Sequence, residues 1–104
     1  MEHLDFDFEA PGGATAPLRP YSLVGVVASG NLEVLMQAAP GGGLCRFEVD
    51  TAADGFQASW QAVIADFMDR HRPAGLQVSI HDHAASPAVV SLRLDQAYEM
   101  LTGK

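Results

Sequence analysis

The chain has 104 residues, the usual length of one domain, and hydrophobic residues make up 48% of it, enough to form a buried core. Its formal net charge of −7 argues against nucleic-acid binding, which needs clustered Lys and Arg. The acidic N-terminus is unlike a signal peptide, and the apolar runs are too short to cross a bilayer. Since the single cysteine excludes an internal disulfide, we expect a cytoplasmic location.

Acidic and aromatic residues alternate at the start of the chain. We predict a short edge strand at 3–8 and then a loop, so that residues 1–20 form an N-terminal segment and residues 21–104 a single domain. Asp5, Asp7 and Glu9 could pair as acid and base. Alternating acids of this kind are more typical of a solvated face.

Two strands rich in Val and Leu are predicted at 21–28 and 32–38, joined as a hairpin by the two-residue loop Gly30-Asn31. In this register Ser29 lies opposite Leu32, at the exposed tip, and Gly30 needs a positive φ. The expected core face carries five apolar residues: Leu23, Val27, Leu32, Val34 and Met36.

A turn at 39–43 is followed by a third strand at 44–49, whose alternation makes Cys45 a core residue. Residues 56–71 change to helical spacing, with Asp54 as the expected N-cap and Pro73 to Gly75 as the stop. Its apolar stripe consists of Phe56, Trp60, Val63, Ile64, Phe67 and Met68. Trp60 and Met68 could contact a cofactor, but such a stripe is more often core.

A fourth strand is predicted at 76–80 and a loop at 81–85. Ser86 and Pro87 have the residue types of an N-cap and first helical position, and Gly103 ends the second helix. The predicted fold is therefore α+β. It combines a small, mostly antiparallel sheet (hairpin, third strand, helix, fourth strand, C-terminal helix) with two helices packed on one face.

Candidate chemistry is sparse. The glycines at 41–43 lack the Lys of a phosphate-binding loop, and Val27 and Asn31 stand where a nucleophile elbow needs glycines. His81 and His83 could supply two ligands of a small metal-dependent enzyme, although solvated loop histidines are the commoner case. A serine hydroxyl without an adjacent base is a poor nucleophile, but an exposed one beside small residues can serve as an attachment point. Ser29 is thus either a turn residue or such a point.

The stretch at 24–35 resembles the acyl carrier subunit of malonate decarboxylase (delta subunit) and, more loosely, that of citrate lyase. The resemblance extends to residues 60–64, 81–82 and 86–97. In these families a Ser-Gly-Asp-type turn carries the modified serine, and Ser29 matches that position. Asn31 stands where the family often has Asp. The Asp-Ser-Leu signature of four-helix carriers is missing.

The resemblance implies that 21–104 is an acyl-carrier domain. Ser29, supported by Ala28, Gly30 and Asn31, would carry 2′-(5″-phosphoribosyl)-3′-dephospho-coenzyme A through a phosphodiester. A prosthetic-group transferase would attach it, a transferase subunit would exchange acetyl for malonyl on its thiol, and decarboxylase subunits would regenerate the acetyl form. The chain itself would be a non-catalytic phosphoprotein, without a metal and without insertion into a membrane. A non-catalytic structural subunit with unmodified Ser29 remains the alternative.

Overall fold

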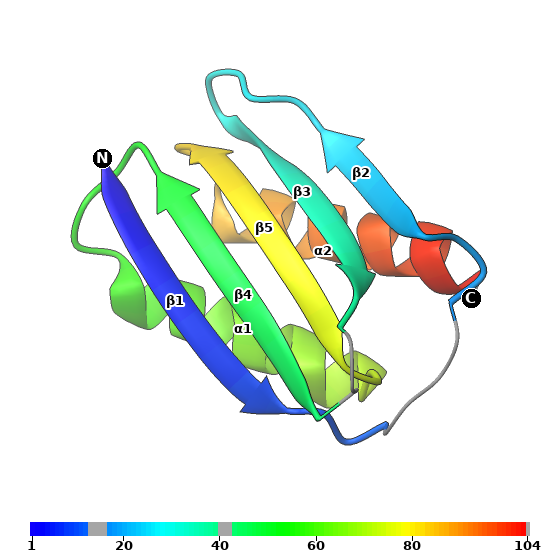
Figure 1. Cartoon of the computed structure of the whole chain (residues 1–104). Coiled ribbons are helices and arrows are strands. Elements are labelled where there is room, and N and C mark those ends of the chain that lie inside the picture. The colour runs from blue at the N-terminus through cyan, green and yellow to red at the C-terminus, as the bar shows by residue number, and fades with distance from the viewer. Residues whose placement is uncertain (13–16, 40–42, 104) are drawn as a thin grey trace.

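A five-stranded sheet with two helices on one face forms the fold (Figure 1). The computed structural model describes residues 1–12, 17–39 and 43–103. Along the chain the elements are β1 (Glu2–Glu9), β2 (Tyr21–Gly25), β3 (Asn31–Ala38), β4 (Leu44–Thr51), α1 (Gln57–His71), β5 (Leu76–His83) and α2 (Pro87–Thr102). The predicted α+β class is therefore confirmed. None of the described helices is long and apolar enough to span a membrane.

The strand order is β1-β4-β5-β3-β2. The pairs β1–β4, β3–β5 and β2–β3 are antiparallel, as predicted for most of the sheet. The pair β4–β5 is parallel, because α1 carries the chain back along the sheet between these two strands. The sheet is thus mixed.

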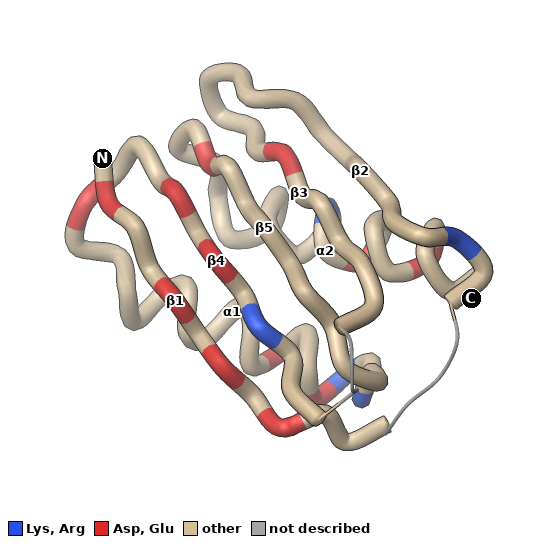
Figure 2. Tube along the Cα trace, in the orientation of Figure 1, with Lys and Arg blue, Asp and Glu red and all other residues tan. Residues whose placement is uncertain are grey.

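Buried and exposed side chains alternate along β1 and β4, which form the left half of the sheet in Figure 1. The predicted edge strand at 3–8 is confirmed as β1, with Leu4 and Phe6 buried. In β4, Cys45 faces the helices, as predicted, and so do Phe47 and Val49. Most of the acidic residues of β1 and β4 alternate with these buried residues and so lie on the opposite face, which no described helix covers. Figure 2 shows that acidic residues gather along these two strands.

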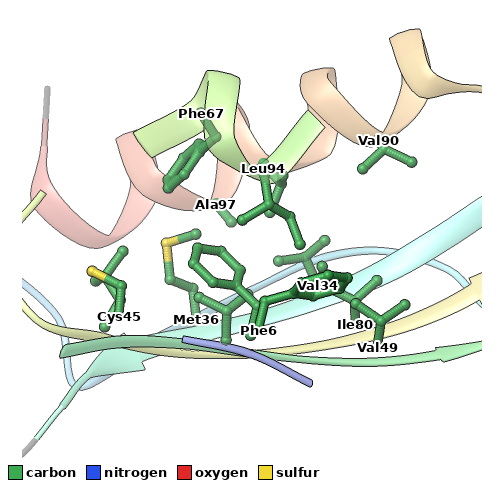
Figure 3. Close-up of a cluster of buried hydrophobic side chains, with 14 of the residues drawn as sticks. Phe6, Val34, Met36, Cys45, Val49, Phe67, Ile80, Val90, Leu94 and Ala97 are labelled. Carbon is green, nitrogen blue, oxygen red and sulfur yellow. The ribbon is translucent and has the colours of Figure 1, made fainter. Parts of the chain in front are cut away.

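The core lies between this sheet and the helices (Figure 3). Phe67 of α1 is fully buried and makes edge-to-face contacts with Phe47 and Tyr98, at centroid distances of 6.1 and 5.7 Å. Trp60 and Met68 are also buried, as the helical stripe predicted, whereas Phe56 is 53% exposed. Burial raises the pKa of the Cys45 thiol.

The two helix starts differ. Ser86 caps α2, and its Oγ accepts a hydrogen bond from the Val89 N–H at 3.3 Å, as predicted. The predicted Asp54 cap of α1 is wrong, because the N-cap is Phe56 and no side chain caps it. Asp54 instead lies 3.6 Å from the N-terminal amine.

The predicted hairpin register is wrong. Ser22 pairs with Met36, and Gly25 with Glu33, so β2 ends at Gly25 and the two-residue loop becomes a longer loop, residues 26–30. Leu23 and Val27 are exposed rather than in the core. The buried residue on β2 is Ser22, whose Oγ donates to the Ala97 carbonyl at 2.7 Å.

The predicted loop at 81–85 is also wrong in part, because β5 continues to His83. Asp82, which is 7% exposed, lies in this extension. Its carboxylate accepts hydrogen bonds from Thr51 Oγ1 and from the Ala84 and Ala85 N–H groups. These hydrogen bonds offset the loss of hydration that burial of the Asp82 carboxylate causes. The predicted turn at 39–43 and the loop after the edge strand lie partly outside the described residues.

Candidate functional site

Ser29 occupies the corner of a β-turn in the loop that joins β2 to β3. This loop lies at the top of the sheet in Figure 1. The Asn31 N–H donates to the Ala28 carbonyl at 2.9 Å, which closes a four-residue turn. Gly30 has φ +75°, the value that the third position of a type II turn requires. Ala28, Ser29 and Gly30 are all exposed. Since the hydrogen bond that closes the turn joins two backbone groups, it does not require the Ser29 hydroxyl.

The turn is held at both of its sides. Gly25, with φ +88°, ends β2 so close to β3 that a Cβ placed there would lie 2.0 Å from the Leu32 carbonyl oxygen. On the other side, the Gly30 N–H donates to the His83 carbonyl of β5 at 2.8 Å. The turn is therefore anchored to β3 on one side and to β5 on the other.

A cation lies next to this turn. Arg93 of α2 is half-buried, and its Nε donates to Asn31 Oδ1 at 3.3 Å. Its Nη1 donates to Gln96 Oε1 at 2.8 Å. Both acceptors are neutral, and within residues 1–12, 17–39 and 43–103 no Asp or Glu forms an ion pair with Arg93. The guanidinium charge remains available to a phosphate.

The histidine pair lies on β5, beside the turn, because His83 pairs with Asn31 of β3. His81 and His83 are two apart on β5, so they share its open face, and both are exposed. His81 Nε2 is 3.7 Å from Asp50 Oδ2. In the part of the chain that the structure describes, no group of three or more His, Cys, Asp or Glu side chains could hold a metal ion. This geometry gives the metal hypothesis no support.

A second histidine cluster involves the N-terminal strand. His3 lies between two carboxylates, with Nδ1 2.7 Å from Asp50 and Nε2 3.0 Å from Asp5. These hydrogen bonds, to Asp50 first and then to Asp5, raise the pKa of His3 above 6.5. Asp5, Asp7 and Glu9 alternate with the buried Leu4 and Phe6 and so lie on the open face, as predicted. In the sheet β1 is three strands away from β3.

Sequence reasoning found Ser29, Ala28, Gly30 and Asn31, and the structure brings these four residues together in one turn. It missed Arg93, because 62 residues separate Arg93 from Asn31 along the chain. The available signal was weak. Arg93 is one of only 6 basic residues in the chain, and α2 places it one turn after the buried Val90.

Comparisons with known proteins agree on one family. The family described as the malonate decarboxylase delta subunit (MdcD) matches residues 21–101. A malonate decarboxylase acyl carrier protein from Xanthomonas euvesicatoria pv. vesicatoria is 53% identical over 103 residues, covering 99% of this chain and 97% of the relative. One from Burkholderia cepacia is 54% identical over 99 residues, covering 93% and 87%.

A solved structure is also similar. It is a chain in the crystal structure of a Pseudomonas malonate decarboxylase hetero-tetramer in complex with malonate. The TM-score is 0.81 and the sequence identity is 41%, with 95% of this chain and 97% of that chain covered. The similarity in sequence and the similarity in fold therefore span the same residues.

Proposed function

The chain belongs to the malonate decarboxylase delta-subunit family, whose members are acyl carrier proteins, and from that premise we propose that Ser29 is the attachment site of its prosthetic group. The observation that carries the proposal is the position of Ser29, exposed at the corner of a turn that Gly25 and the Gly30–His83 hydrogen bond hold in place. A modifying enzyme can reach such a hydroxyl without unfolding the sheet.

We infer that the group is 2′-(5″-phosphoribosyl)-3′-dephospho-coenzyme A, joined to Ser29 through a phosphodiester. When bound, it supplies a thiol that forms thioesters. The residues present fit a group that is anionic next to its attachment point. Ser29 is exposed, and a Cβ placed at the neighbouring Gly30 would meet nothing within 4 Å, so this side of the turn is open to solvent. Arg93 offers a guanidinium whose hydrogen-bond acceptors are neutral.

In this proposal the chain binds and presents the group, and its partners do the chemistry. A transferase subunit would exchange the acetyl group for malonyl, and decarboxylase subunits would return the malonyl form to acetyl. Tethering makes each encounter intramolecular, with a high effective concentration. No general acid or base is then required at the turn, which agrees with an enzyme subunit that is itself non-catalytic. We also infer a cytoplasmic location.

Intact-mass measurement on protein purified from its native host during growth on malonate tests the proposal. We expect a mass increase equal to the complete group, which fragmentation localises to Ser29. The Ser29→Ala variant should keep its fold and lose the increase, while Ser59→Ala, which removes another exposed serine, should keep it. An unmodified wild-type chain in a complex that turns over malonate would refute the attachment and support the structural-subunit alternative.

The role of Arg93 has its own test. We expect Arg93→Gln to slow attachment of the group by the prosthetic-group transferase by roughly tenfold or more, because a hydrogen bond to a charged group contributes about 1.5–3 kcal/mol. Arg93→Lys keeps the charge and should retain more of the rate. Equal attachment rates for the Gln variant and the wild type would show that Arg93 does not contact the phosphates.

A further inference from the structure

A pocket of about 300 Å³ lies between the first turns of the two helices and the ends of β4 and β5. Its walls are mainly apolar and include Phe56, Trp60, Val63, Pro87 and Val90. Ser59, Ala84 and Pro87 at its rim are exposed, so the pocket can be reached from solvent. This is the size and composition of a site for a small, largely apolar group.

The pocket lies at the same end of the strands as the Ser29 turn. The Gly30 N–H binds the His83 carbonyl at 2.8 Å, and Ala84 and Ala85, which directly follow His83, line the pocket. Two residues of chain span at most about 7 Å. Helix α2 also links the pocket to the turn. Val90 lines the pocket, and Arg93, three residues later on the same helix face, donates to Asn31.

The polar part of the wall limits what the pocket can hold. Asp82 is the acidic residue in the lining, and Thr51, Ala84 and Ala85 donate to its carboxylate at 2.9, 3.2 and 3.0 Å. A second carboxylate in the pocket would lose its hydration among apolar side chains and lie near a like charge. An uncharged, partly apolar end would lose little.

We propose that this pocket binds the acetylated end of the arm carried by Ser29, an inference that rests on the proposed function. The volume of about 300 Å³ corresponds to roughly ten water molecules at about 30 Å³ each, enough for an acetyl thioester and the atoms next to it. The apolar wall then keeps water and other nucleophiles away from the thioester between visits to partners. A malonylated end, with its terminal carboxylate, stays outside and available to a partner.

Nuclear magnetic resonance on the loaded protein tests this without any turnover. Trp60 is the only tryptophan, so its indole N–H gives a single resonance from the pocket wall. Intact mass first establishes that the arm is on Ser29, and the thiol is then acetylated chemically. We expect the indole resonance and the Val63 and Val90 methyl resonances to shift between the thiol and acetyl forms. The malonyl form should shift them much less.

Reaction of the thioester with hydroxylamine gives the second readout. An arm that occupies the pocket about two-thirds of the time should react on the order of threefold more slowly than an acetylated model thiol. Ser59→Leu, which fills the pocket from the first turn of α1, should remove both the shifts and the protection. Ala58→Leu is the matched control, because Ala58 is exposed in the same turn and does not line the pocket.

The outcomes separate the two proposals. A chain without the added mass overturns the attachment at Ser29 and this inference with it. A loaded chain whose acetyl form leaves the pocket resonances unchanged and its thioester unprotected overturns the pocket alone. Equal shifts for the acetyl and malonyl forms overturn the preference for an uncharged end.

Discussion

Replacing Gly25 by alanine should destabilise the fold more than replacing any other glycine near the Ser29 turn. Gly25 has φ +88°, and a left-handed conformation costs a residue with a Cβ about 1–2 kcal/mol. In addition, the new Cβ would lie 2.0 Å from the Leu32 carbonyl oxygen, which is backbone and cannot rotate away. Overpacking that shifts backbone costs a further ~1–3 kcal/mol. The expected loss of unfolding free energy is therefore about 2–5 kcal/mol.

Two other glycines calibrate this value. Gly30 has φ +75° but open space around a new Cβ, so Gly30→Ala should cost only the conformational part, about 1–2 kcal/mol. Gly43, just before β4, has neither a positive φ nor a neighbour within 4 Å, so Gly43→Ala should be close to neutral. The predicted order of stability is Gly43→Ala, then Gly30→Ala, then Gly25→Ala.

Urea unfolding followed by circular dichroism measures these differences, and thermal melting checks them at about 4–8 °C per kcal/mol for a domain of this size. Loading of Ser29 adds a functional readout. Gly25→Ala must move β2 away from β3 and should slow attachment of the prosthetic group, whereas Gly43→Ala should not. Equal stability of the Gly25 and Gly43 variants would refute the close approach of β2 to the Leu32 carbonyl and, with it, the anchoring of the turn to β3.

Three further perturbations test other parts of the structure. Asp50→Asn should lower the pKa of His3 toward 6.5, which the pH dependence of the His3 ring resonances measures. The raised pKa stabilises the folded state in acid. This contribution to stability is complete below pH 6.5 and disappears as the pH rises through the pKa of the folded state. Ser86→Ala should cost about 1 kcal/mol in urea unfolding, while Asp54→Ala should change little, because Ser86 caps the start of α2 and Asp54 does not cap α1. Cys45 should react with iodoacetamide only as fast as the protein opens, since burial excludes the reagent and raises the thiol pKa; rapid alkylation of the native protein would show that Cys45 is not a core residue.

The parts of the fold that sequence alone predicted are those with an unambiguous period. Residues 44–49 alternate strictly, and so they fixed both the strand and the face of Cys45. The stripe from Trp60 to Met68 has a period that only a helix can bury on one side. Ser86 and Pro87 combine two local signals for a helix start. In each case the local preference and the tertiary packing favour the same structure.

The hairpin failed because its sequence has no period. Val24, Val26 and Val27 are apolar on both faces of a strand, so several registers bury a similar number of residues. In the observed register Gly25 lies against the Leu32 carbonyl, and that contact exists only once β2 and β3 have paired. The exposed Val26 and Val27 therefore flank the Ser29 turn instead of filling the core.

The two features that matter most for the candidate site depend on contacts between distant segments. Asp82 reads as a loop residue, because an acidic residue beside two histidines rarely lies in a buried strand. Thr51, 31 residues away, supplies one of the donors that make its burial acceptable. Arg93 similarly reads as one more polar position on an amphipathic helix until β3 places Asn31 beside it. No pattern within either segment contains this information.

The positions of the charged residues bear on whether an acidic chain can carry the anionic arm proposed for Ser29. Most acids of the sheet lie on β1 and β4, whereas the Ser29 turn joins β2 and β3 (Figure 2). In the order β1-β4-β5-β3-β2, β3 is two strands from β4 and three from β1, or roughly 10 and 14 Å at about 4.8 Å per strand. Those distances exceed the screening length of about 8 Å at physiological ionic strength. Two acids lie nearer the turn, because Glu33 pairs with Gly25 and Asp82 pairs with Leu32. The guanidinium of Arg93, beside Asn31, would offset their repulsion of the proposed phosphates in a chain whose net charge is −7.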